Sequence, residues 1–238
     1  MHVTISLPEG SECLLTKGQD VDFTTPFLKA HNAVEMTIPI GKKLKIDGTK
    51  IFKYVKKFVG EKVQKNEVIA TRKSFFLSHT IVSEHDGVIK EIDHTQGVIV
   101  IKTKSDEMTD RTSYFTGEIT EVDKHEVVLK TKKGSSFKTS RSSENFGGEV
   151  WYGTEAALSS VTTEDVENRV VVVDSLTPYD QAKLEAMGIR GYITVEPLRE
   201  YTYLPNARLK EDDVAAARKE KHTYCVIDTP SSTIYFYD

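Results

Sequence analysis

Cysteine is scarce in this sequence, and long apolar runs are missing. The two cysteines, Cys13 and Cys225, stand near opposite ends of the 238 residues, with no CxxC or Cys/His spacing. We therefore expect no disulfide framework, zinc site or thiol redox motif. Apolar runs such as Val170 to Val173 fall far short of the roughly 20 residues that span a bilayer, and Met1 to Leu15 lacks the basic start and apolar core of a signal peptide. These absences predict a cytoplasmic protein without a transmembrane segment.

Signature motifs of catalysis are missing as well. The sequence contains no GxSxG, HExxH, Walker-type or DxDxDG pattern, and these spacings mark common nucleophile, zinc, phosphate and calcium sites. We therefore predict no catalytic residue, no metal and no cofactor. The absence weighs against an enzyme but leaves that question open.

Charge and composition divide the chain. With 38% hydrophobic and 29% charged residues, it has the composition of an ordinary globular protein. The net charge is +4 over residues 1–143 and −8 over residues 144–238, which indicates that the two parts face different neighbours. Residues 134–148 are rich in glycine and serine, as is typical of a loop or linker. We predict three regions, which are a β domain at 1–104, a hairpin module with this linker at 105–146, and an α/β domain at 147–238.

The N-terminal part shows two internal echoes within short alternating runs that predict β structure with little helix. Each copy of the first echo is typical of a β-hairpin whose turn begins at Asp. In this first echo, Gly87 to Asp93 and Val98 to Lys104 resemble Gly117 to Asp123 and Val127 to Lys132. A second, fainter echo relates Gly18–Val21 to Gly60–Val63.

One stretch carries a family resemblance. Gly60 to Lys73, followed by Ile81 to Ile92, resembles the biotinyl/lipoyl-like barrel-sandwich hybrid. That family has a GDxVxxGDxL strand-turn-strand, a hairpin and then SPxxGxVxxI, and here Asn66 stands in place of the second glycine. The resemblance covers about residues 55–104, and the Gly18–Val21 echo extends it toward residue 1. It implies a small two-part β-barrel, while the C-terminal half resembles no family that we recognise.

The resemblance also implies a position for a prosthetic group. Carrier members of the family are modified on a lysine at an exposed hairpin tip, and Lys73 is the corresponding residue. Its flanks, Thr71-Arg-Lys-Ser-Phe75, match neither the MKM nor the DKA signature of the carriers. A swinging-arm carrier modified at Lys73 is therefore an alternative function, and the main prediction includes no cofactor.

The C-terminal part has the alternation of an α/β domain. Val170 to Val173 is typical of a buried parallel strand, and the helix after it has Thr177 as a cap and Pro178 in its first turn. Together with a returning strand, this predicts one right-handed βαβ unit. The full expected order is strand 169–174, helix from 178 to 187, strand 189–195, helix 211–221, strand 224–228 and strand 233–237. The overall fold class is thus α+β and multi-domain, with a β-rich barrel-sandwich part, a hairpin module and a small α/β open sheet.

Polar residues follow the expected strands of this domain. Because open α/β sheets bind ligands at the carboxyl ends of their strands, these residues form a candidate ligand site. No glycine-rich phosphate loop follows the first strand, and such residues are also common in ordinary loops. The candidate ligand residues are Asp174, Ser175, Glu196, Asp228 and Thr229.

A basic stretch runs from Lys42 to Lys73, with aromatic residues between the lysines. Such a pattern suits a nucleic acid backbone with stacked bases, although a pI near 6.0 and the excess of lysine over arginine favour caution. Residues 49–59 also fit an amphipathic element with lysines in water and Ile51, Phe52, Val55, Phe58 and Val59 facing the core. The candidate basic surface consists of Lys42, Lys43, Lys45, Lys53, Lys56, Lys57 and Lys62.

Taken together, these features predict a non-catalytic binding or assembly module of a larger cytoplasmic complex, with one or more protein partners. Two small interaction-prone folds, opposite charge on the two parts and the lack of catalytic motifs favour this function. The alternatives are the carrier modified at Lys73 and a nucleic-acid-binding protein that uses the Lys42 to Lys73 stretch.

Overall fold

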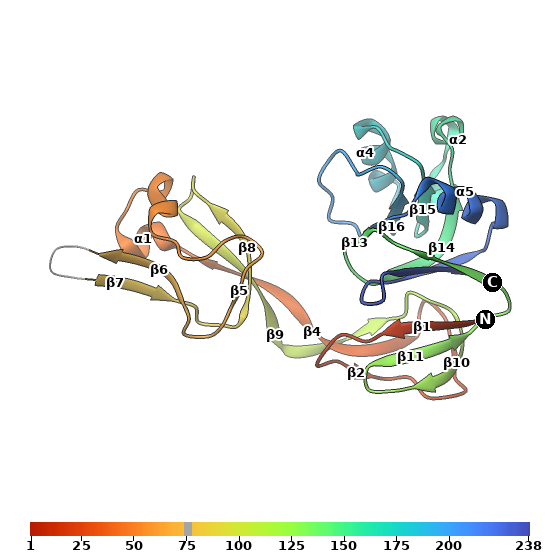
Figure 1. Ribbon diagram of the computed structural model, residues 1–238, viewed down its shortest axis with the longest axis horizontal. Coiled ribbons are helices and arrows are strands. Elements are labelled where there is room, and N and C mark those ends of the chain that lie inside the picture. The colour runs from red at the N-terminus through yellow and green to blue at the C-terminus, as the bar shows by residue number, and fades with distance from the viewer. Residues whose placement is uncertain (74–77) are drawn as a thin grey trace. The chain divides into compact units, whose positions relative to one another are not determined.

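Two compact units make up the chain in the computed structural model, which describes residues 1–73 and 78–238. Strand accounts for 44% and helix for 17%, so the protein is β-rich, as predicted. Unit 1 comprises Met1–Ala30 and Asp110–Asp238, and unit 2 comprises His31–Thr109. The chain passes into unit 2 along β4 (Pro26–Ile38) and returns along β9 (Val98–Thr112) (Figure 1). These divisions differ from the predicted boundaries after residues 104 and 146, because composition gives no sign that one unit is interrupted by the other.

Unit 1 contains two large sheets. A four-stranded antiparallel sheet has the order β1-β11-β10-β3, and a mixed eight-stranded sheet has the order β12-β19-β18-β14-β15-β16-β17-β13. The first consists of β1 (His2–Ser6), β3 (Asp20–Val21), β10 (Gly117–Val122) and β11 (Glu126–Lys130). The second consists of β12 (Gly134–Lys138), β13 (Arg141–Ser142), β14 (Phe146–Tyr152), β15 (Val170–Val173), β16 (Gly191–Thr194), β17 (Asn206–Arg208), β18 (Tyr224–Asp228) and β19 (Thr233–Tyr237). A short strand, β2 (Glu12–Cys13), pairs with β4.

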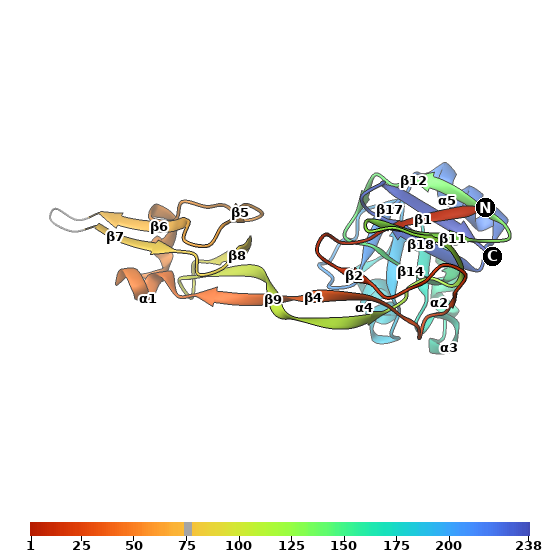
Figure 2. The ribbon, with the colours of Figure 1, turned by 90° about the horizontal axis from the view of Figure 1, so that it is seen from below.

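Helices cover both faces of the eight-stranded sheet (Figures 1 and 2). Successive side chains of a strand point to opposite faces, so Val171 and Val173 pack with α2, α3 and α4, whereas Val170 and Val172 pack with α5. All four valines are buried, which explains the unbroken apolar run in the sequence. The helices are α2 (Glu155–Ser160), α3 (Thr163–Val166), α4 (Pro178–Ala186) and α5 (Glu211–Glu220).

The six strands and helices predicted for this region are all present, but β14, α2, α3 and β17 were not predicted, and β17 lies between β16 and α5. The Thr177 hydroxyl accepts a hydrogen bond from the backbone N–H of Asp180 at 3.1 Å, with Pro178 in the first turn. β18 and β19 begin and end at the expected residues. One feature differs, because β18 runs antiparallel to β14, whereas β14, β15, β16 and β17 are mutually parallel.

The segment 134–148, predicted to be a loop or linker, instead supplies β12, β13 and the start of β14. Two of its glycines allow the backbones of neighbouring strands to approach closely. A Cβ atom on Gly147 would lie 2.3 Å from the carbonyl oxygen of Cys225, and one on Gly134 would lie 2.7 Å from that of Phe236. The glycine-rich composition therefore reflects tight strand pairing.

The four-stranded sheet packs against the outer face of β18 and β19. Val3, Ile5 and Leu129 share a buried cluster with Val226 and Tyr237. The hydroxyl of Tyr237 also accepts a hydrogen bond from the backbone N–H of Thr116 at 3.2 Å. The two sheets thus form one continuous interior within unit 1.

Unit 2 is smaller and has its own apolar core, which includes Ile40, Ile51, Ile69, Ile89 and Ile99. A hairpin of β6 and β7 lies beside a sheet in which β5 pairs with β8 and β8 pairs with β9. Its further elements are α1 (Ile40–Leu44), the 3₁₀ helix η1 (Gly48–Lys53), β5 (Lys62–Val63), β6 (Val68–Lys73), β7 (Ser78–Val82) and β8 (Gly87–Asp93).

The fainter echo of the sequence corresponds to a repeated turn in the two units. Gly18 and Gly60 both have positive φ angles, 82° and 87°. The backbone N–H of Gly18 donates to Ile119 O at 2.7 Å, and that of Gly60 donates to Ile89 O at 2.7 Å. Three residues later, Val21 pairs with Gly117 in unit 1, and Val63 pairs with Gly87 in unit 2.

The stronger echo continues this repeat. A buried serine precedes each second half, and its hydroxyl donates to the carbonyl two residues later, from Ser113 to Phe115 at 2.7 Å and from Ser83 to His85 at 2.5 Å. The hairpin that follows is irregular at matching places, between Ile119 and Glu121 and between Ile89 and Glu91. Both echoes therefore belong to one structural repeat. In each unit, the turn at Gly18 or Gly60 forms the first half of the repeat, and the serine with its hairpin forms the second half. Residues 31–109 separate the two halves in unit 1. Strands β6 and β7 separate them in unit 2.

Candidate functional site

The residues at the expected strand ends separate into two groups. Asp174 and Ser175 follow β15 and Glu196 follows β16, and the backbone N–H of Glu196 donates to Asp174 O at 3.0 Å. The Asp174 carboxylate accepts from Arg218 of α5 at 2.9 Å. These three residues are brought together, on an exposed loop edge where Asp174 already has a cationic partner.

Asp228 and Thr229 lie at the opposite end of the sheet. Because β18 is antiparallel to β14, its last residues stand beside the start of β14, where Phe146 pairs with Ile227. The structure therefore places the five candidate residues at two opposite ends of the sheet.

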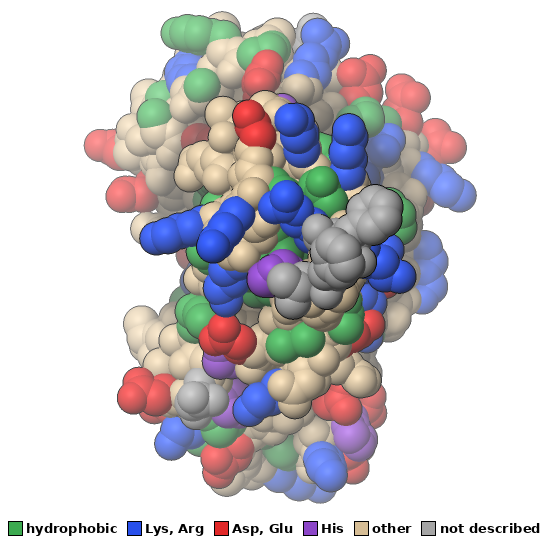
Figure 3. All heavy atoms as spheres, turned by 90° about the vertical axis from the view of Figure 1, so that its left-hand side faces the viewer, with side chains coloured by type: hydrophobic (Ala, Val, Ile, Leu, Met, Phe, Trp, Pro, Cys, Tyr) green, Lys and Arg blue, Asp and Glu red, His purple; other side chains and the backbone are tan. Residues whose placement is uncertain are grey.

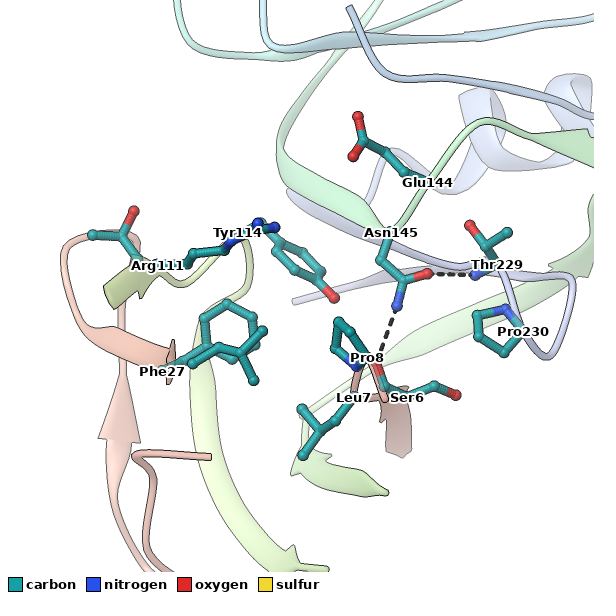
Figure 4. Close-up of a pocket in the computed structure, with 12 residues that line it drawn as sticks. Ser6, Leu7, Pro8, Phe27, Arg111, Tyr114, Glu144, Asn145, Thr229 and Pro230 are labelled. Atoms are coloured by element: carbon teal, nitrogen blue, oxygen red, sulfur yellow. Dashed lines mark hydrogen bonds between the residues drawn. The ribbon is translucent and has the colours of Figure 1, made fainter. Parts of the chain in front are cut away.

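A cavity of about 410 Å³ lies next to Asp228 and Thr229 in unit 1 (Figure 4). This volume falls within the range of about 300–1,000 Å³ found for small-molecule sites. Five separate segments of the chain surround it. Its apolar lining consists of Leu7, Pro8, Phe27, Leu28, Tyr114 and Pro230.

Hydrogen bonds fix the polar side of this cavity. The Asn145 side chain donates to Ser6 O at 3.1 Å and accepts from the backbone N–H of Thr229 at 2.8 Å. Asp228, which is 1% exposed, accepts from the backbone N–H and hydroxyl of Ser6 at 2.8 and 3.1 Å and from the N–H of Ser231 at 3.1 Å. The loops after β1 and β18 are thus held together by side chains, which makes the cavity a preformed one.

Tyr114 and Glu144 line the cavity beside Asn145. The hydroxyl of Tyr114 points toward Asn145, whereas the carboxylate of Glu144 points away from the cavity (Figure 4). Burial raises the pKa of the Tyr114 phenol well above its ordinary value. The hydroxyl therefore stays protonated at neutral pH and keeps a hydrogen-bond donor.

Sequence reasoning did not find this cavity. Its walls come from residues more than 200 positions apart, and Asn145 falls within the segment predicted to be a linker. No local pattern marks such a site. The nearest signal was the prediction of Asp228 and Thr229 as strand-end residues.

Lys73, the candidate modification site, is the last residue of β6 and is exposed. It pairs with Ser78 of β7. The residues that the sequence places between them, 74–77, lie outside the described residues. The structure therefore places Lys73 at the end of β6, directly before those residues.

Several of the candidate lysines lie along β6. Arg72 donates to Leu44 O and Lys45 O at 2.7 and 2.8 Å, which fixes the end of α1 against β6. The backbone N–H of Lys56 donates to Ile69 O at 2.8 Å, and Lys53 ends η1 one residue before Tyr54, whose carbonyl accepts from the N–H of Thr71. Basic side chains gather on this end of unit 2 (Figure 3). We refer to Lys45, Lys53, Lys56, Arg72 and Lys73 as the β6 basic cluster.

Other members of the predicted set have carboxylate partners. Lys57 contacts both Glu61 and Glu67, and these bonds raise its pKa, while Lys43 lies 3.3 Å from Glu84. Within residues 1–73 and 78–238, by contrast, Lys42, Lys62 and the lysines of the β6 basic cluster have no carboxylate oxygen within 4.0 Å. Lys43 and Lys57 thus form ion pairs with carboxylates, whereas the lysines of the β6 basic cluster have no such partner among the described residues.

The amphipathic-element prediction for residues 49–59 is only partly right. Ile51 is buried, but Phe52, Phe58 and Val59 are 59%, 78% and 61% exposed. The helix ends at Lys53 and the chain then pairs with β6, so the helical spacing that would have turned these side chains inward is lost. Apolar side chains therefore lie in water beside the lysines.

The described residues offer no metal site and no membrane-spanning helix. Within the described ranges, no group of three or more His, Cys, Asp or Glu side chains is arranged to hold a metal ion. The helices found there are too short or too polar to span a bilayer. Comparison of the chain with protein-family models, with curated proteins and with solved structures finds no match.

Proposed function

We propose that this chain is a non-catalytic binding module of a larger cytoplasmic complex, and that it docks on an acidic protein through the β6 basic cluster. The observation that carries the proposal is that five basic residues lie on β6 or on segments hydrogen-bonded to it, and that exposed Phe58 and Val59 follow Lys56 closely in the chain. Residues 42–73 hold eleven basic and three acidic residues. A surface that combines lysines with apolar side chains fits a partner with carboxylates around an apolar patch.

A protein partner is favoured over nucleic acid by two features. The whole chain has a net charge of −4, and ten of the eleven basic residues in the stretch are lysines. Arginine is the residue that pairs best with phosphate through two parallel hydrogen bonds.

Charge reversal of the cluster tests this function. We expect the triple variant Lys45→Glu, Lys53→Glu and Lys56→Glu to recover at least tenfold less of the acidic partner in affinity isolation from native cells under nuclease treatment. The reason is that each change replaces attraction by repulsion at the interface. Binding of the unchanged protein should also weaken as salt rises, because salt screens exposed charges.

The matched control is Lys17→Glu, Lys124→Glu and Lys132→Glu, which makes the same change of charge on exposed lysines of unit 1. It should leave partner recovery unchanged. An equal loss in both triple variants would show that only net charge matters. Recovery of a monomeric, partner-free protein would contradict the proposal, and nuclease-sensitive recovery would support the nucleic-acid alternative instead.

We further propose that unit 2 is a barrel-sandwich hybrid of the biotinyl/lipoyl-like kind. The positive φ angles of Gly60 and Asn66, at 87° and 68°, support this, because Asn66 occupies the place of the family's second glycine. A Cβ on Gly87 would lie 2.6 Å from Lys102 O, so this position also requires glycine.

The carrier alternative then depends on Lys73. We expect the intact mass of the chain from native cells to equal the sequence mass, because the residues around Lys73 lack the signature that the modifying ligases recognise. The measurement is intact-protein mass spectrometry, with Lys73→Arg as the control. A mass increase that disappears in Lys73→Arg would establish the carrier function.

A further inference from the structure

The cavity of unit 1 has a wall of aromatic rings. Phe27 and Tyr114 line it with their ring centroids 5.5 Å apart and their planes at 88°, and Phe115 packs behind Phe27 at 5.2 Å. Aromatic rings favour edge-to-face or offset-stacked contacts with one another, so this wall suits a ligand that carries a ring. Leu7, Leu28 and the two prolines complete the apolar part of the lining, which suits a ligand with an apolar ring.

The charged group that the cavity offers to a ligand is a cation. Arg111 lines it, and Figure 4 shows its side chain on the side of Tyr114. The carboxylate of Glu144 points away (Figure 4), and that of Asp228 is buried behind the wall with three hydrogen bonds. A guanidinium carries five N–H donors, so Arg111 can bind a carboxylate while it keeps contacts of its own.

Neutral donors also line the cavity. The Thr229 hydroxyl accepts a hydrogen bond from Ser142 at 3.1 Å and still has its own proton to donate. The Tyr114 hydroxyl is protonated, as described above. The polar groups therefore offer donors to a ligand, and an acceptor group on the ligand satisfies them.

From this arrangement we infer that the cavity of unit 1 binds a small aromatic carboxylate, with its ring against Phe27 and Tyr114 and its carboxylate on Arg111. The cavity lies wholly within unit 1, so this site is independent of the docking surface proposed for unit 2. A negative result for one proposal therefore does not contradict the other.

The test uses the full-length chain and two probes of the same shape, 2-naphthoate and the neutral 2-naphthamide, followed by NMR titration of backbone amides. We expect 2-naphthoate to bind saturably and to shift the amides of Leu7, Leu28 and Asn145. We expect Arg111→Gln to weaken 2-naphthoate about tenfold and 2-naphthamide hardly at all, since only the first has a charge for the guanidinium. Arg199→Gln, which removes an exposed arginine of unit 1 elsewhere, is the matched control.

Two cavity-filling variants locate the site. Pro8 and Pro230 are exposed and line the cavity from different loops. Pro8→Trp and Pro230→Trp should each abolish binding of both probes, and two variants guard against a folding defect in one. Absence of saturable 2-naphthoate binding, binding that survives both tryptophan variants, or an Arg111→Gln variant with unchanged affinity would each overturn the inference.

Discussion

Gly147→Ala should destabilise unit 1 by about 3 kcal/mol or more. The added Cβ would lie 2.3 Å from Cys225 O, 2.7 Å from Tyr114 O and 3.2 Å from Val226 Cα. All three are backbone atoms, which have no rotamer to change, so β14 and β18 must move apart. In a thermal unfolding experiment this should lower the melting temperature by roughly 6–12 °C.

Gly18→Ala is the control for this prediction. Gly18 also lies in unit 1, but nothing stands within 4 Å of its added Cβ. The only cost is its left-handed backbone, with φ at 82°, and this should be about 1–2 kcal/mol. Equal melting temperatures for the two variants would show that the strands at Gly147 have room to separate.

Asp228→Ala should lower the free energy of unfolding of unit 1 by about 2–4 kcal/mol. The reason is that the Ser6 N–H, the Ser6 hydroxyl and the Ser231 N–H lose a buried acceptor. The Asp228 carboxylate joins residues 222 positions apart when it accepts from Ser6. Its loss leaves the backbone N–H of Ser6 without that partner and frees the end of β1. Urea unfolding measures the loss, and hydrogen exchange at the Ser6 amide should become faster.

Two further variants rank the contributions. Asp228→Asn keeps one carbonyl oxygen and should lose less stability than Asp228→Ala. Ser6→Ala removes only the 3.1 Å hydroxyl bond and should cost about 1 kcal/mol. A ranking in which Ser6→Ala is as damaging as Asp228→Ala would contradict the role given to the backbone bond.

Local patterns predicted six of the C-terminal strands and helices and missed β14, α2, α3 and β17. Val170 to Val173, the Thr177 cap and the last two strands each have a signal within a few residues. Strand direction has no such signal. Nothing in Tyr224 to Asp228 states that β18 runs against β14, and the candidate site at the strand ends was divided for that reason.

Glycine and aromatic positions were harder to predict because their meaning depends on distant neighbours. Gly134 and Gly147 suit a linker as well as a close strand pair, and only the atoms of Phe236 and Cys225 decide between them. Phe58 and Val59 matched a helical core pattern, but the helix ends before them. The candidate lysines were found by composition, although their partners Glu61, Glu67 and Glu84 were not.

The chain ends are tied to the same short segment of unit 1. The amino group of Met1 donates to Thr131 O at 2.8 Å, and the backbone N–H of Asp238 donates to Lys133 O at 3.1 Å. A stretching force applied between the two ends would therefore first load the pairing of β1 with β11 and of β12 with β19. Residues 31–109 would carry no tension until these ladders rupture, so in a pulling experiment unit 2 should extend second, after unit 1 has opened.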